Sequence, residues 1–150
     1  MAKISIFAGS VYGNAQHVAE ETSGMFEKHG IESEVFTDPE ISDFVDAYAV
    51  VVITSTTGQG DVPPNLELFF SDLRDEFPMM NSKPFAVAAL GDSSYGESYC
   101  GAGKQFQELL TELQGKPVAE MLEVDAIETL AAEEEVVPWL ENLVPQLIES

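Results

Sequence analysis

The chain has 150 residues, the size of one ordinary domain with a single buried core. Its apolar fraction of 45% and charged fraction of 22% are those of a globular protein and exclude a disordered one. Because 27 acidic residues face six basic ones, the formal net charge of −21 disfavours nucleic acid and anionic membranes and favours basic protein partners.

The compartment follows from what the sequence lacks. No apolar run approaches the roughly 18–20 residues that cross a bilayer, and residues 1–7 lead into a strand pattern without a signal-peptide core. The single cysteine, Cys100, excludes an internal disulfide. We therefore expect a cytoplasmic protein with one domain over residues 1–150.

Strand-like and helix-period segments alternate through the first part of the chain. Lys3–Ala8 alternates in polarity, which predicts a strand, and Asn14–His29 carries apolar side chains at helical spacing. Glu32–Thr37 alternates again, as an edge strand does. Ala49–Thr54 is continuously apolar and β-branched, which is typical of a strand covered on both faces.

The same alternation continues through the second part of the chain. Asn65–Phe77 predicts a helix whose inward face includes Phe77. Phe85–Leu90 is a second fully apolar strand, Ala102–Leu113 is a helix, and Val118–Val124 is the last strand.

The remaining residues predict a closing helix that contains two prolines. Pro138 fits best in a first helical turn, and Pro145 is expected to disturb any long continuous helix. Glu133–Glu135 is a solvated acidic stretch near the start of this helix, where negative charge is mildly favourable.

Alternating strands and helices of this length predict an α/β fold with a parallel sheet and helices on both faces. Five strand–helix units, with two strands buried on both faces, favour a three-layer sandwich whose five-stranded sheet has the order 2-1-3-4-5. Ligands bind beyond the carboxyl ends of the strands in such sheets. The loops that follow the strands are therefore the candidate site.

The first of these loops, Gly9–Asn14, suits a phosphate group. Its glycines let the backbone approach a ligand, and the following helix offers unpaired N–H groups to an anion. Ser10, Tyr12 and Asn14 add neutral donors, and the absence of lysine excludes a Walker A loop. Taken alone, such a strand-to-helix turn is more often structural than functional.

Two further loops follow the buried strands, and the second of them suits a flat aromatic ligand. Ser55–Asn65 is longer and more polar than a connector needs to be, and its structural alternative is a surface loop that ends in an asparagine cap. Gly91–Gly101 carries Tyr95 and Tyr99 among small polar residues, so that one ring can stack on a ligand while backbone groups bind its polar edges. All three loops follow parallel strands and are expected to meet at one edge.

Three motifs now give a specific resemblance. Gly9-Ser10-x-x-Gly13-Asn14, Ser55-Thr56-x-Gly58, and Leu90-Gly91-Asp92-Ser93-Ser94-Tyr95 followed by Tyr99-Cys100-Gly101 resemble the three FMN loops of flavodoxins. The resemblance covers the whole chain and implies a flavodoxin-like fold. It is closest to the short-chain group, which includes MioC-type single-domain flavodoxins and the FMN domains of diflavin reductases, because Val124 leads directly to Asp125 without the long-chain insertion.

The resemblance implies FMN as the cofactor, and no catalytic or metal-binding residue. The FMN-binding residues that it implies are Ser10, Val11, Tyr12, Gly13, Asn14, Ala15, Ser55, Thr56, Thr57, Gly58, Gln59, Gly60, Leu90, Gly91, Asp92, Tyr95, Tyr99, Cys100 and Gly101.

The resemblance also implies a role for several of these residues. Tyr95 would stack on the outer face of the flavin ring, and Thr57 occupies the inner-face position where many flavodoxins carry an aromatic residue. The peptide at Gly58 would flip to bind the protonated N5 of the semiquinone. Ala15 departs from the pattern, since many relatives have a hydroxyl there, so one hydrogen bond to the phosphate is missing.

By the same resemblance the chain is a monomeric electron carrier and not a turnover enzyme, cycling chiefly between semiquinone and hydroquinone. Its partners would be a basic-faced reductase of the ferredoxin/flavodoxin-NADP type and an acceptor protein. An NAD(P)H-dependent quinone reductase and a regulatory protein with weak FMN affinity stay open. A phosphorelay receiver is disfavoured, because Thr54-Ser55 stands where its phosphoacceptor aspartate is needed.

Overall fold

A computed structural model describes residues 3–10, 13–55, 61–91, 100–125 and 131–148. In chain order its elements are β1 (Lys3–Gly9), α1 (Asn14–Lys28), β2 (Glu32–Phe36), α2 (Ile41–Val45), β3 (Ala49–Ser55), α3 (Pro64–Glu76), β4 (Pro84–Gly91), α4 (Gly101–Glu112), β5 (Lys116–Pro117), β6 (Leu122–Asp125) and α5 (Glu133–Ile148). The parallel strands follow the order β2-β1-β3-β4-β5. The first residues of β4 pair with β5, and its last four residues pair with β6.

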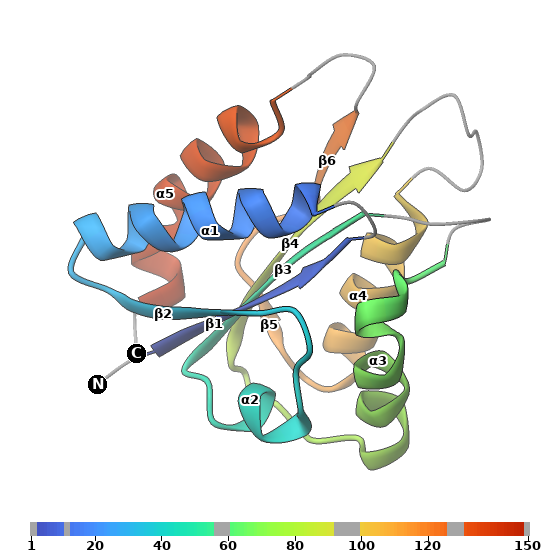
Figure 1. Cartoon of the computed structure of the whole chain (residues 1–150). Helices are drawn as coiled ribbons and strands as arrows, with labels where there is room; N and C mark the ends of the chain where they lie inside the picture. The colour runs from blue at the N-terminus through green and yellow to red at the C-terminus, as the bar shows by residue number, and fades with distance from the viewer. Residues whose placement is uncertain (1–2, 11–12, 56–60, 92–99, 126–130, 149–150) are drawn as a thin grey trace.

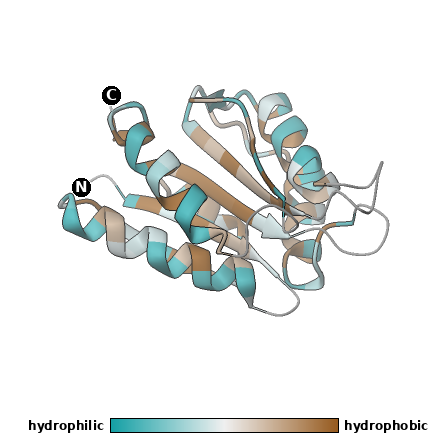
Figure 2. Ribbon diagram, turned by 90° about the horizontal axis from the view of Figure 1, so that it is seen from above, coloured by the Kyte–Doolittle hydropathy of each residue, from teal (hydrophilic) through white to brown (hydrophobic). Residues whose placement is uncertain are grey.

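The sheet is covered on both faces, which confirms the predicted three-layer fold. Helices α1 and α5 lie together on one face, and α3 and α4 lie on the other (Figure 1). Figure 2 shows the hydrophobic strands between these two helical layers. Two apolar clusters fill the space between the layers, one around Ile6 and Phe26 and the other around Phe7 and Phe106, all four fully buried.

The predicted last strand, Val118–Val124, is confirmed only in part: β6 covers its end from Leu122, whereas residues 118–121 form no strand and the short β5 precedes them. Phe85 pairs with Pro117 in β5, and Ala88 pairs with Leu122 in β6. Four residues, 118–121, therefore lie opposite the two β4 residues between these pairs. The extra length lets the chain bend away from β4 between β5 and β6, as a bulge does, although the N–H of Val118 still donates to the carbonyl of Phe85 at 3.1 Å.

The closing helix is longer and more regular than its prolines predicted. Helix α5 runs unbroken from Glu133 to Ile148 and contains both Pro138 and Pro145. Each internal proline removes one backbone hydrogen bond and costs about 3 kcal/mol in an isolated helix. Burial of the apolar face of α5 against the sheet and α1 offsets this cost.

Two further features were not predicted correctly. Helix α2 was missed, because it has only five residues and is held by distant groups: Lys83 Nζ donates to the carbonyls of Phe44 and Val45 at 3.0 Å each. Burial at this place lowers the pKa of Lys83. Phe77, expected to face inward, caps the end of α3 in the left-handed region with φ 50° and is 45% exposed.

Gly103 lets α4 lie directly on β4, and this contact gives a test of the packing. A Cβ at Gly103 would stand 2.4 Å from the Cβ of Ala89, whereas a Cβ at Gly24 in α1 would meet nothing within 4 Å. We expect Gly103→Ala to lower the free energy of unfolding by about 1–3 kcal/mol through overpacking. The control Gly24→Ala should raise it by about 0.5–1 kcal/mol. Equal effects of the two substitutions in urea unfolding would contradict this packing.

Candidate functional site

The carboxyl ends of four strands stand side by side at one edge of the sheet (Figure 1). Gly9 at the end of β1 pairs with Thr54 of β3, and Ser55 pairs with Leu90 of β4. Gly91 pairs in turn with Asp125 at the end of β6. The three loops that the sequence analysis selected therefore leave the sheet from adjacent positions on the same edge.

The turn from β1 into α1 is built to bring backbone N–H groups to this edge. Gly13, the N-cap of α1, has φ 85°, a left-handed conformation that glycine adopts at low cost. Its N–H donates to Ser10 Oγ at 2.7 Å, and its carbonyl accepts from the N–H of His17 at 3.0 Å. Ser10 Oγ accepts this bond, so its own hydroxyl proton can be donated to a ligand.

Asn65 joins three backbone segments beneath the first loop. Its Oδ1 accepts from the N–H of Ser10 at 3.0 Å. Its Nδ2 donates to the carbonyl of Ala8 at 2.8 Å and to that of Thr37 at 2.9 Å. One side chain on α3 thus fixes the ends of β1 and β2, and it does so with every hydrogen-bonding group of its amide.

Asn65 is a residue of this edge that the sequence analysis did not identify. The sequence suggested an asparagine cap as the ordinary explanation of this position, but the N-cap of α3 is Pro63. The sequence signal that could have identified Asn65 is its position at the end of the loop Ser55–Asn65. Its partners lie 28 to 57 residues away in the chain, and no local pattern reports such contacts.

Two of the three helices that follow the predicted FMN loops, α1 and α4, differ from the other helices in the charge of their first turns. Neither α1 nor α4 has an acidic residue in its first turn or a side-chain hydrogen bond at its N-cap. In contrast, α2 carries Asp43, α3 carries Glu67 and α5 carries Glu133–Glu135 in their first turns. In a chain with 27 acidic residues, α1 therefore begins without a carboxylate, and a helix N-terminus of this kind can bind an anion through its N–H groups.

Cys100 shapes the start of α4. It is fully buried, has φ 55°, and its Sγ lies 3.6 Å from the carbonyl oxygen of Ala89 in β4. Its own carbonyl accepts from the N–H of Lys104 at 3.1 Å. Cys100 is therefore a small buried residue that positions the first turn of α4.

The described part of the predicted site is uncharged and converges on one edge. Ser10, Gly13, Asn14 and Ala15 form the β1–α1 turn, and Ala15 is fully buried, so it can offer only its backbone. Ser55, Leu90 and Gly91 end β3 and β4, and Cys100 and Gly101 begin α4. The others, Val11, Tyr12, Thr56, Thr57, Gly58, Gln59, Gly60, Asp92, Tyr95 and Tyr99, lie outside the described residues.

These donors fit a phosphate monoester. A helix N-terminus without carboxylates, a left-handed glycine and a serine hydroxyl bind a dianion through neutral groups. Among the described residues no three His, Cys, Asp or Glu side chains gather as metal ligands would. The described helices also include none that is long and apolar enough to cross a membrane.

Comparison with known proteins identifies the same family over most of the chain. The sequence profile of the family described as Flavodoxin matches residues 6–139. Flavodoxin YqcA of Escherichia coli (strain K12) is 44% identical over 145 residues, which cover 95% of this chain and 96% of that protein.

Solved structures agree with the sequence comparison. A mutant of the flavodoxin from Pseudomonas aeruginosa superposes with a TM-score of 0.91 at 37% identity, covering 97% of this chain and 98% of the other. The flavodoxin of Fusobacterium nucleatum bound to flavin mononucleotide shares the fold, with a TM-score of 0.82 at 15% identity over 97% of this chain and 99% of that one.

Replacing Asn65 tests its role in fixing the edge. Asn65→Ala leaves the N–H of Ser10 and the carbonyls of Ala8 and Thr37 without their partner. We expect the free energy of unfolding to fall by about 2–4 kcal/mol. Asn142→Ala, on the exposed side of α5, is the control and should change it by less than about 0.5 kcal/mol. A similar small change for Asn65→Ala in urea unfolding would show that this amide does not hold the edge together.

Proposed function

The chain belongs to the flavodoxin family, whose members transfer electrons with a bound flavin, and from this premise we propose that it carries single electrons on non-covalently bound FMN. It cycles chiefly between the one-electron and two-electron reduced forms of the cofactor. It is a carrier that passes electrons between proteins and not an enzyme that turns over a substrate of its own.

The observation that carries the proposal is the uncharged, donor-rich start of α1. The chain has a net charge of −21, so a dianionic phosphate is repelled by most of its surface. The β1–α1 turn is an exception, because Ser10, Gly13 and Asn14 present neutral donors and no carboxylate stands in the first turn. The proposed phosphate ligands are these residues with Val11, Tyr12 and the backbone of Ala15.

The flavin ring then lies over the ends of β3 and β4. We assign one face of the ring to Tyr95 and the other to Thr57, and the pyrimidine edge to backbone groups at Asp92, Tyr99 and Cys100. The remaining contacts come from neighbouring residues of the loops and of the element ends that flank them: Ser55, Thr56, Gly58, Gln59, Gly60, Leu90, Gly91 and Gly101. The bound FMN supplies the redox chemistry, and the chain's own groups orient the ring and exclude water from its inner face.

The acidic surface accounts for the proposed partners. A reductase of the ferredoxin/flavodoxin-NADP type and an acceptor protein, each with a basic face, are attracted to a protein of this charge. The negative charge also disfavours adding the second electron to the flavin, which lowers the potential of that step. We place the protein in the cytoplasm as a monomer.

Two properties of the purified protein test this function at once. The protein should be yellow, or become yellow when FMN is added, and should pass electrons only when a separate reductase is present. Oxidation of NAD(P)H by the protein alone would instead identify a quinone reductase. A protein that binds no FMN would be a regulatory or binding protein.

A carboxylate placed at the start of α1 tests the phosphate site. Asn14 is exposed in the first turn of α1. We expect Asn14→Asp to weaken FMN binding at least about 10-fold by repulsion of the phosphate, and to leave the affinity for riboflavin, which has no phosphate, unchanged. Flavin-fluorescence titrations measure both affinities. Equal weakening for the two ligands would place the phosphate elsewhere.

A second substitution tests the assignment of Thr57 to the inner face of the ring. Stacking contributes about 0.5–1.5 kcal/mol beyond the burial of area, so Thr57→Trp should tighten FMN binding about 2- to 10-fold. Riboflavin binding should tighten by the same factor, because the ring and not the phosphate is contacted. An unchanged affinity for both ligands would remove Thr57 from the ring site.

A further inference from the structure

Two adjoining hollows form one groove between α3 and α4, on the side of the sheet opposite α1 and α5. The upper hollow, of about 480 Å³, begins at Asp61 and Val62 beside the strand-end edge. The lower hollow, of about 210 Å³, reaches Leu109 and Glu112 on α4. The two share Phe70, Arg74 and Gln105 in their linings, so they adjoin each other.

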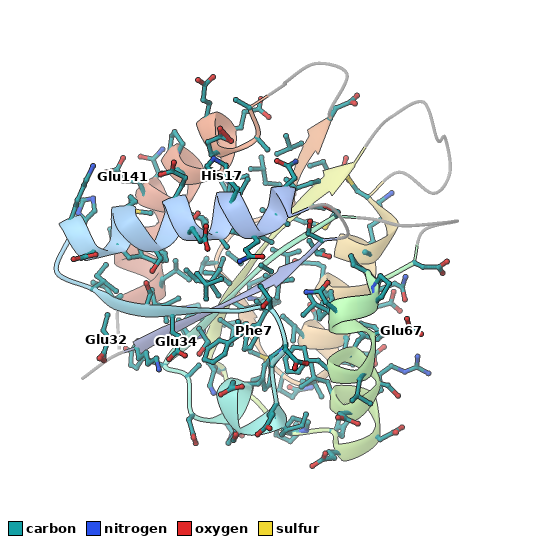
Figure 3. All side chains as sticks on the ribbon, in the orientation of Figure 1. Phe7, His17, Glu32, Glu34, Glu67 and Glu141 are labelled. Carbon is teal, nitrogen blue, oxygen red and sulfur yellow. The ribbon has the colours of Figure 1, made fainter. Side chains whose placement is uncertain are left out.

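The groove has an apolar floor and an alternating charge pattern. Phe70 and Leu109 are almost completely buried and line its base. Glu67 lies at the upper end and projects from α3 (Figure 3), whereas Glu108 and Glu112 lie at the lower end on α4. Arg74 stands between them with its guanidinium 5.9 Å from the centre of the Phe70 ring.

These charges are not neutralised within the described part of the chain. Histidine and lysine side chains elsewhere pair with carboxylates, as His29 does with Glu141 at 2.8 Å. Arg74 and the three glutamates of the groove form no such ion pair with another described residue. The groove therefore presents a negative, positive, negative sequence of exposed charges along its length.

We propose that this groove docks a segment of a partner protein that carries basic side chains at both ends and a carboxylate at its centre. The basic ends meet Glu67 above and Glu108 and Glu112 below, and the central carboxylate pairs with Arg74. Apolar side chains of the segment cover Phe70. Opposite charges in this order fix the register of the segment, which net acidity alone does not do.

The groove begins close to the proposed flavin site. Its upper end at Asp61 directly follows the loop 56–60, which is part of the proposed flavin site. A partner held along α3 and α4 therefore extends to the flavin edge without occupying it. This inference rests on the proposed carrier function for its biological meaning, but the binding itself does not depend on the flavin.

A labelled synthetic peptide tests the groove directly. The probe is a 14-residue peptide with lysines at both ends and one central glutamate, added to the FMN-loaded protein at low ionic strength and followed by fluorescence anisotropy. We expect Glu67→Gln combined with Glu108→Gln to weaken binding about 10-fold. The matched control, Glu20→Gln combined with Glu27→Gln on exposed positions of α1, changes the net charge equally and should weaken it less than about 2-fold.

A charge exchange at the centre tests the register. Arg74→Glu should weaken the binding of the original peptide and strengthen that of a peptide whose central glutamate is replaced by lysine. Equal weakening by the two glutamine pairs, or the same response of both peptides to Arg74→Glu, would overturn the proposal in favour of attraction by overall charge. Measuring FMN binding and peptide binding separately distinguishes the two hypotheses. A protein that binds FMN but not the peptide contradicts the groove. A protein that binds the peptide but takes up no FMN contradicts the carrier function.

Discussion

Parallel pairing between β1, β3 and β4 is the constraint on which the candidate site depends. Because Gly9 lies opposite Thr54 and Ser55 opposite Leu90, three loops whose first residues are more than 35 positions apart in the chain begin within one row of the sheet. A slip of one residue in these strands would turn every side chain from one apolar cluster toward the other, where the packing differs. Asn65 then ties the first loop to the ends of β1 and β2. The site is thus held by backbone hydrogen bonds and by one amide.

Electrostatics divides the molecule into a neutral edge and an acidic body. The start of α1 has no carboxylate, although acidic residues outnumber basic ones by 27 to six. A dianionic phosphate can be bound there without a lysine because helix N–H groups and Ser10 supply the donors. In the proposed function the acidic body attracts basic partners, and in the proposed docking groove Arg74 makes that attraction specific.

The sequence was sufficient for the strand order and for the edge that carries the loops, because apolar β-branched runs such as Ala49–Thr54 and the glycines after them are local signals. The sequence was insufficient where contacts between residues far apart in the chain determine the local structure. Pro138 predicted a first helical turn and Pro145 a disturbed helix, yet both lie inside α5, which burial keeps continuous. Asn65 resembled an ordinary cap, but its partners come from Ala8, Ser10 and Thr37.

Backbone amide resonances measured before and after addition of FMN test the central claim most directly. We expect the largest chemical-shift changes at residues 10–15, 55–60 and 90–101. We expect none at the opposite edge of the sheet, around Lys83 and Lys116. Addition of riboflavin should reproduce the shifts of the second and third segments and leave those at Gly13 and Asn14 small, since no phosphate reaches them. Equal shifts at Gly13 and Asn14 with both ligands, or shifts centred on Lys83, would contradict a phosphate site at the start of α1.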